Sequence, residues 1–118
     1  MTDAYNPKAP RGAGFAGVRA DFSAGRDTPG DYLDRHLKII YAREDTLRAF
    51  AALDPDGARA AAAAATRRYR NGAPLSAVDG LPIAFKDIFE VEGLPTAWGV
   101  AGLARTALRD AAIVNALR

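Results

Sequence analysis

The chain has 118 residues, of which 49% are hydrophobic and 25% charged, as in ordinary globular proteins. This length suits one small domain, and the net charge of +2 is too small to indicate binding to DNA or to an anionic membrane. The absence of cysteine excludes disulfides, thiolate catalysis and zinc sites built on cysteine. No stretch has the apolar length of a membrane span, and the first residues lack a signal-peptide core, so we expect a cytoplasmic protein.

Residues 1–27 are rich in proline and glycine and show little periodicity, so we expect an irregular arm that lies on a surface. Within this arm, "GAGFAG" (Gly12–Gly17) matches the letters of the dinucleotide-binding fingerprint. That fingerprint requires a strand before the glycines and a helix directly after them. Because Pro7 and Pro10 leave no room for a strand, we interpret the glycines as part of a flexible arm.

Residues 28–118 carry the signals of one α/β domain, beginning with a helix from Pro29 to about Arg43 or slightly beyond. Thr28 is a suitable N-cap, proline is favourable at the first helical position, and Asp31 completes the spacing of a capping box. Apolar side chains then recur at helical intervals, at Leu33, Leu37, Ile40, Tyr41 and Leu47. The run Leu47–Leu53 could extend this helix or form a strand.

A second helix is predicted between Asp54, its N-cap, and the stop signal Asn71-Gly72. Its many alanines favour helix strongly, and their small side chains would let another element approach closely. The basic residues at its end have two interpretations, a favourable interaction with the helix dipole or a contact to RNA; they are Arg67, Arg68 and Arg70. A single cluster without a wider basic face favours the first.

Short β-type segments follow at Leu81–Phe85 and Phe89–Val91, and a turn is predicted at Gly93–Pro95. A last helix is predicted after Asp110, which would cap it. Helices that alternate with short strands indicate the α/β class.

Lys86 is the residue whose chemistry stands out, because it follows an apolar segment in a chain with only three lysines. Burial disfavours the charged ammonium, which makes a lysine usable as a general base, whereas arginine keeps its proton. The alternative is a structural lysine at a strand end that pairs with Asp87. His36, the single histidine, is expected to pack at a helix flank, and one histidine excludes a Ser-His-Asp triad within this chain.

The stretch "PLSAVDGLPIAFKDIFEVEGLPTAWG" resembles the lysine-bearing segment of the amidase signature family. The matching positions are Pro74, Leu75, Gly80, Pro82, Lys86, Asp87, Gly93, Leu94, Pro95, Thr96 and Gly99. The alanine-rich segment upstream and "DAAIVNALR" downstream are similar to the family as well, so the resemblance covers about residues 28–118.

The resemblance implies the N-terminal part of an amidase domain, with helices around a mixed sheet, and hydrolysis of carboxylic amides by a Ser–cis-Ser–Lys triad. In that triad Lys86 would be the base, without a metal or cofactor, and the partners would be an amide substrate and a complementing chain that carries the serines. The family's glycine- and serine-rich segment does not occur in these residues, whose only serines are Ser23 and Ser76. We therefore expect an enzyme fragment that is inactive alone.

Two other interpretations of the resemblance stay open. The chain could be a non-catalytic accessory protein derived from the fold, or part of an amidotransferase A-type subunit that acts on aminoacyl-tRNA. Ala97, Trp98 and Val100 replace the small or hydroxylated residues often seen after Pro-Thr in the family, so the substrate is not indicated.

Overall fold

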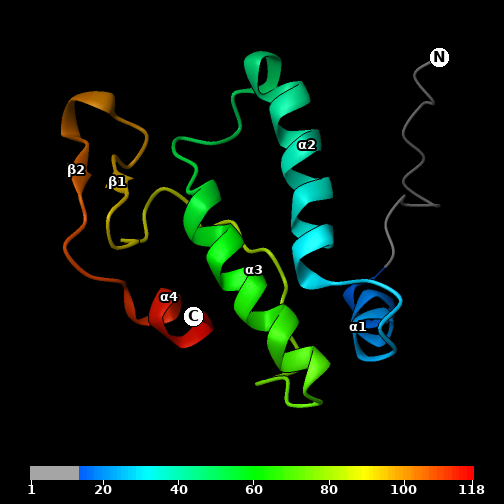
Figure 1. The fold of residues 1–118 in the computed structure, drawn as a ribbon. Coiled ribbons are helices and arrows are strands. Elements are labelled where there is room, and N and C mark those ends of the chain that lie inside the picture. The colour runs from blue at the N-terminus through cyan, green and yellow to red at the C-terminus, as the bar shows by residue number, and fades with distance from the viewer. Residues whose placement is uncertain (1–13) are drawn as a thin grey trace.

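A computed structural model describes residues 14–118, which form four α-helices, a short 3-10 helix and a two-stranded antiparallel sheet (Figure 1). The helices are α1 (Phe15–Ser23), α2 (Pro29–Leu47), α3 (Pro55–Arg70) and α4 (Ala112–Leu117). Strands β1 (Pro95–Thr96) and β2 (Arg105–Thr106) flank the 3-10 helix η1 (Ala101–Leu103). This content is consistent with an α/β fold, although the described residues contain only this small sheet and no larger mixed one.

Helix α2 begins at the predicted capping box and is longer than the predicted minimum. The Oγ1 of Thr28 accepts a hydrogen bond from the backbone N–H of Asp31 at 3.1 Å, and proline occupies the first helical position. The helix ends at Leu47, because Arg48 has the left-handed backbone conformation with φ of 48°. Residues 48–53 therefore neither extend the helix nor form a strand.

Helix α3 confirms the prediction at both ends. The Asp54 carboxylate accepts the N–H of Gly57 at 2.9 Å, and the helix stops at Arg70, directly before Asn71-Gly72. The alanine side chains also act as expected, since Leu33 and Leu37 of α2 pack against Ala62 of α3 in a buried cluster. The two helices consequently lie side by side (Figure 1).

Helix α1 differs from the irregular arm expected over residues 1–27, for the part that the structure describes. Residues 1–13 lie outside the described residues, as does the start of the "GAGFAG" motif, but Gly17 lies within the helix. Val18 and Phe22 are buried against Tyr69 of α3, and the rings of Phe22 and Tyr69 meet edge to face at 5.3 Å. Val18 and Phe22 are spaced i, i+4, so they lie on the same face of a helix, which favours a helix that packs on α3.

The predicted strands at Leu81–Phe85 and Phe89–Val91 are wrong, because neither segment has regular structure. A strand exists only when a neighbouring strand takes up its backbone N–H and C=O groups, and no such neighbour pairs with these segments among residues 14–118. The pairing instead forms between β1 and β2, with Pro95 opposite Thr106 and Thr96 opposite Arg105.

The last predicted helix is present as α4, but Asp110 does not cap it. Ala111 occupies the N-cap position without a side-chain hydrogen bond. The Asp110 carboxylate instead accepts the N–H of Glu92 at 2.7 Å and pairs with Arg118 at 3.0 Å. Asp110 therefore ties the segment before β1 to α4, while Val114 anchors the helix with no exposed surface.

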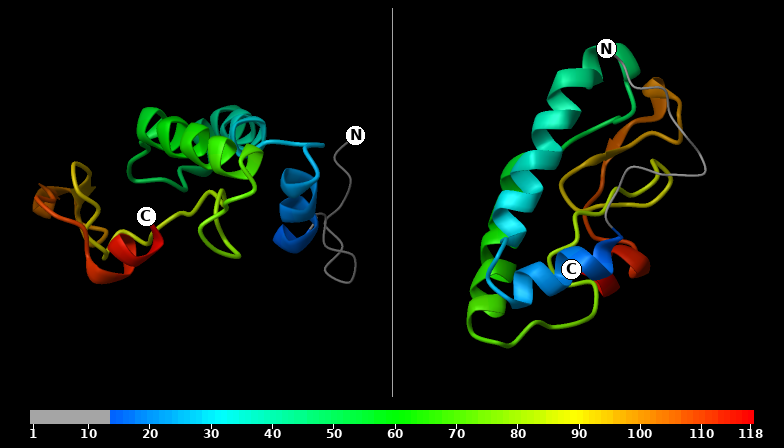
Figure 2. Two further views of the ribbon diagram at one scale, coloured as in Figure 1. Left: turned by 60° about the horizontal axis from the view of Figure 1, so that its bottom comes forward. Right: turned by 90° about the vertical axis from the view of Figure 1, so that its right-hand side faces the viewer.

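The C-terminal half of the described chain leaves much apolar surface exposed. The strands and α4 lie to one side of the α2–α3 pair (Figure 2). Many large apolar side chains of this C-terminal half are exposed, among them Ile83, Ile88, Trp98, Leu103 and Leu108.

Gly80 joins the loop after α3 to the lysine segment in a conformation that only glycine adopts easily. Its φ is +82°, and a Cβ built there would lie 2.9 Å from Cγ of Pro29. We expect Gly80→Ala to lower the free energy of unfolding by about 1–3 kcal/mol. Chemical denaturation checks this, with Gly17→Ala as the control, because a Cβ at Gly17 meets nothing within 4 Å and lies in a helix. Equal stability of the two variants would contradict the prediction.

Candidate active site

Lys86 lies in a turn with an exposed side chain. Its carbonyl oxygen accepts the N–H groups of Ile88 at 2.7 Å and Phe89 at 3.0 Å, which fixes the backbone that follows. The described residues do not bury the amine at a strand end, because the preceding segment is no strand and Ile83 and Ala84 are themselves exposed. Shielding of the lysine would need further atoms over this surface.

Asp87 does not form the ion pair with Lys86 that a purely structural role for the lysine would require. Its carboxylate accepts backbone N–H groups from a later loop, Ala97 at 2.9 Å and Gly99 at 3.3 Å. Its carbonyl oxygen accepts the N–H of Trp98 at 3.1 Å. No ion pair to Lys86 is found within residues 14–118. The amine is thus free of a carboxylate partner in the described part of the chain.

The loop that Asp87 holds has an unusual backbone. Trp98 has φ of +50° and Gly99 has φ of +77°, and only the glycine tolerates this region without cost. The exposed Trp98 ring lies under the guanidinium of Arg105, at 5.2 Å from its centroid. The hydrogen bonds from this loop to Asp87 bring together two separate parts of the motif, the Lys-Asp pair and the residues after Pro-Thr.

The β1–β2 pairing frames this loop. The N–H of Gly93 donates to the carbonyl of Ala107, and the N–H of Ala107 donates to the carbonyl of Leu94, both at 3.0 Å. Thr96 is buried with 3% of its surface exposed, although its side chain is polar. The end of the Gly-Leu-Pro-Thr stretch thus forms β1 and leads directly into the loop that Asp87 holds.

A partly buried ion pair anchors the segment before Lys86 on α3. Arg68 donates to both carboxylate oxygens of Asp79, at 2.8 and 2.6 Å, and Asp79 also accepts the N–H of Leu75. The hydroxyl of Tyr69 donates to the Asp79 carbonyl at 3.0 Å. The hydrogen bond from the Arg68 guanidinium, together with backbone N–H groups, holds the pKa of the Asp79 carboxyl below its ordinary range, against the opposing effect of burial.

Sequence reasoning missed this pair, because it assigned Arg68 to the helix dipole together with its neighbours. Arg67 and Arg70 remain exposed, while Arg68 is partly buried. The available signal was a lone acidic residue, Asp79, directly before a motif glycine and eleven positions after an arginine on a helix. Nothing local to the sequence distinguishes Arg68 from the other two arginines.

The other candidate residues lie apart from Lys86. The Oγ of Ser76 accepts the N–H of Val78 in the turn before Asp79, and Ser23 ends α1, so neither is hydrogen-bonded to the lysine in the structure described. His36 packs at the flank of α2 as predicted, with its Nδ1 2.8 Å from the Tyr32 carbonyl oxygen.

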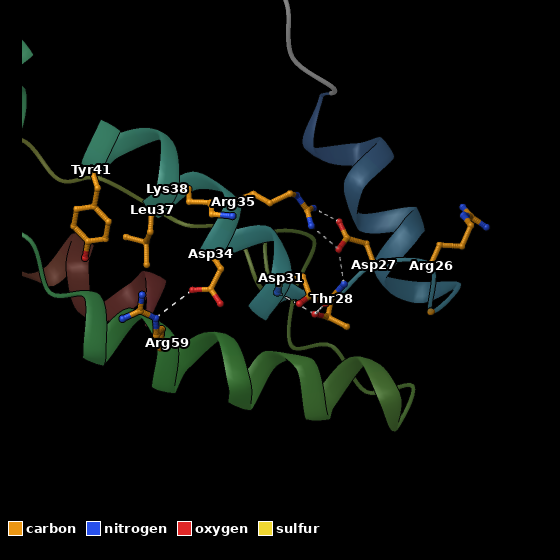
Figure 3. Close-up of a pocket in the computed structure, with 11 residues that line it drawn as sticks. Arg26, Asp27, Thr28, Asp31, Asp34, Arg35, Leu37, Lys38, Tyr41 and Arg59 are labelled. Atoms are coloured by element: carbon orange, nitrogen blue, oxygen red, sulfur yellow. Dashed lines mark hydrogen bonds and ion pairs between the residues drawn. The ribbon is translucent and has the colours of Figure 1, made fainter. Parts of the chain in front are cut away.

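A polar hollow of about 780 Å³ lies along α2 and is lined by neither Lys86 nor Asp87. Figure 3 shows Arg35 pointing toward Asp27 and Arg59 toward Asp34, while Arg26 points away from them. Arg35 donates to Asp27, which lowers the pKa of that carboxyl, and Arg59 pairs with Asp34 at 3.1 Å. These four charged side chains therefore pair with one another inside the hollow.

Two further kinds of feature are missing from residues 14–118. None of their helices is long and apolar enough to cross a membrane. Their histidine, aspartate and glutamate side chains also form no group of three or more that is placed to bind a metal ion.

Comparison with known families decides what the lysine turn belongs to. The family model described as Amidase matches residues 31–118, which include the Lys86 turn, the Asp87 contacts and the β1–β2 pair. The chain belongs to the amidase family. The matched region begins within α2 and leaves α1 outside it.

The amidase-family chain is similar to several curated proteins that are named as the A-type subunit of glutamyl-tRNA(Gln) amidotransferase. It is 43% identical to that of Chloroflexus aurantiacus over 82 residues, which cover 70% of this chain. It is 39% identical to that of Myxococcus xanthus over 82 residues, and 34% identical to that of Salinispora arenicola over 99 residues, or 84% of this chain. The aligned part spans only 17–19% of the length of these relatives.

Proposed function

We propose that this chain contributes the general base, Lys86, to an amidase active site that cleaves carboxylic amides through a Ser–cis-Ser–Lys triad. The observation that carries the proposal is the family match over residues 31–118, within which Lys86 and Asp87 form the Lys-Asp motif. The matched region contains one other lysine, Lys38, which lies on α2 and outside that motif. The motif therefore supports Lys86 as the proposed base.

The proposed reaction requires Lys86 to accept a proton. In its neutral form the Lys86 amine would take the proton of the middle serine, that serine would take the proton of the nucleophilic serine, and the nucleophile would attack the amide carbonyl carbon. The carbonyl oxygen then carries the negative charge, which backbone N–H donors stabilise. The product amine leaves with a proton returned along the same relay, and water then hydrolyses the acyl-enzyme to release the carboxylic acid and free the serine. The serines of this relay are not among the 118 residues.

The surface around Lys86 supports a site that is completed by further atoms. Ile88, on the lysine turn, is 46% exposed, and Ile83, in the segment before the turn, is 40% exposed. Trp98, in the loop that Asp87 holds, is 42% exposed. Exposed apolar side chains at these positions favour contact with another surface. Covering them would also remove water from the amine, which favours its neutral form.

A second candidate function is favoured by the relatives, which are named for glutamyl-tRNA(Gln) amidotransferase. In this version Lys86 has the same role, but the amide nitrogen is transferred to glutamyl-tRNA(Gln) and not released, and the partners include further subunits of that amidotransferase. A non-catalytic accessory role is the outcome to expect if Lys86 proves dispensable.

A chimera tests the proposal. The 82-residue region of the Chloroflexus aurantiacus protein that aligns with this chain would be replaced by the corresponding residues of this chain, which are 43% identical. We expect the chimera to hydrolyse simple carboxylic amides, and the 118-residue chain alone to show no turnover above background, because it lacks the serine relay. Ammonia release measures both.

The same chimera separates the two candidate functions. Assembled with the remaining Chloroflexus subunits, it would be supplied with glutamyl-tRNA(Gln), and formation of the amidated product would favour the amidotransferase. Turnover by the isolated chain that disappears in Lys86→Ala would contradict the proposal, since it would require a nucleophile that the triad does not place here.

A further inference from the structure

We propose that Asp87 is a positioning residue, which holds the Lys86 turn and the loop Ala97–Gly99 together so that a rigid backbone directs the lysine amine and the adjacent carboxylate does not pair with it. This inference rests on the proposed function for its catalytic consequence. Its structural part, the attachment of the loop to the turn by Asp87, stands independently of that function.

The attachment uses three hydrogen bonds from consecutive residues to one aspartate. The side-chain oxygens accept from Ala97 and Gly99, at 2.9 and 3.3 Å, and the main-chain oxygen accepts from Trp98 at 3.1 Å. An ionised carboxylate only accepts hydrogen bonds and offers two oxygens, so it suits two converging N–H groups. Asparagine offers one side-chain acceptor oxygen and would lose one of the two.

These contacts offset a conformational cost in the loop. Trp98 has a positive φ of 50°, which is unfavourable for a residue with a large side chain. Backbone in such a conformation persists when surrounding contacts determine it. In this loop the hydrogen bonds to Asp87 engage all three N–H groups, from Ala97 to Gly99.

The consequence for the lysine comes through the backbone. Lys86 is bonded covalently to Asp87, and its own carbonyl is fixed by the N–H groups of Ile88 and Phe89. Because the loop engages the Asp87 carboxylate, that carboxylate does not form an ion pair with the adjacent amine. Such a pair would favour the ammonium form, which cannot accept a proton.

The first test is amide hydrogen exchange on the 118-residue chain. In Asp87→Ala we expect the N–H groups of Ala97 and Gly99 to exchange about ten-fold faster than in the unsubstituted chain, and in Asp87→Asn one of the two to do so. Asp56→Ala is the matched control, because that carboxylate is 98% exposed on α3. Unchanged exchange at both amides in Asp87→Ala would overturn the inference. If Asp87→Ala does not fold, Asp87→Asn decides. Faster exchange at one of the two amides supports the attachment, and unchanged exchange at both overturns it.

The second test uses the chimera and readouts that a purely structural role would not move. A positioning role predicts that Asp87→Ala has a lower kcat with little change in KM, because the amine loses its orientation. The acid limb of its kcat profile should move to higher pH, since a displaced amine is more hydrated and more often charged. Asp87→Asn should recover part of the lost kcat. A lower yield of active protein with an unchanged pH profile would overturn the positioning role.

The two proposals fail in different ways. If Lys86→Arg retains turnover, the proposed function fails, while the exchange result at Ala97 and Gly99 still reports on the attachment. If Lys86→Arg is inactive and Asp87→Ala keeps the kcat and pH profile of the unsubstituted chimera, the positioning role alone is overturned.

Discussion

Lys86→Arg in the chimera should lower kcat about 10²–10⁴-fold, as much as Lys86→Ala, because loss of a general base has this magnitude. Arginine keeps its proton in proteins and so cannot accept one from a serine, although it carries the same charge as a protonated lysine. A lysine that only formed a surface ion pair would tolerate arginine. The measurement is steady-state amide hydrolysis by both variants over a range of pH.

The control for this prediction is Lys38→Arg, because Lys38 is an exposed lysine on α2 that lies within the family match but outside the Lys-Asp motif. We expect its kcat to equal that of the unsubstituted chimera. Circular dichroism of all three variants would establish that they are folded. Substantial turnover by Lys86→Arg would make the lysine structural and the base assignment wrong.

Arg68→Met should destabilise the 118-residue chain by about 2–4 kcal/mol, because it leaves the buried Asp79 carboxylate without its bidentate partner. The Asp79 side chain is only 5% exposed, whereas Arg68 keeps 30% of its side chain in solvent, which moderates the effect. Chemical denaturation followed by circular dichroism measures it. Loss of this pair would also free the segment that leads from α3 to Gly80 and Lys86.

An exposed ion pair on α3 provides the control. Arg59→Met removes a contact to Asp34 in which both side chains are about half exposed or more, so we expect a change below about 1 kcal/mol. Similar losses in the Arg68 and Arg59 variants would show that burial of Asp79 does not matter.

The Arg68–Asp79 pair also predicts how stability depends on pH. The pKa of Asp79 in the folded chain lies below its ordinary value of 3.8, with the hydrogen bond from Arg68 as the main cause. The pair therefore contributes fully above about pH 4, and its contribution is lost as pH falls through the folded-state pKa. Arg68→Met should remove this part of the acid dependence, which denaturation curves between about pH 2 and pH 6 would reveal.

The sequence by itself determined helices α2 and α3 of this protein. Thr28 with Asp31 and Asp54 with Gly57 form caps within four residues of chain, so the starts of α2 and α3 follow from local chemistry. The stop at Asn71-Gly72 is equally local. The order of motif residues around Lys86 likewise indicated the amidase family, which the match over residues 31–118 confirmed.

Tertiary structure alone decided what surrounds the lysine. The choice of Arg68 over its neighbours as partner of Asp79, and of Ala97 and Gly99 as partners of Asp87, depends on contacts between residues ten or more positions apart. The strand predicted at Leu81–Phe85 is absent for the same reason. A helix satisfies its hydrogen bonds within one segment, whereas a strand or a bridging carboxylate needs a partner that only the folded chain brings near.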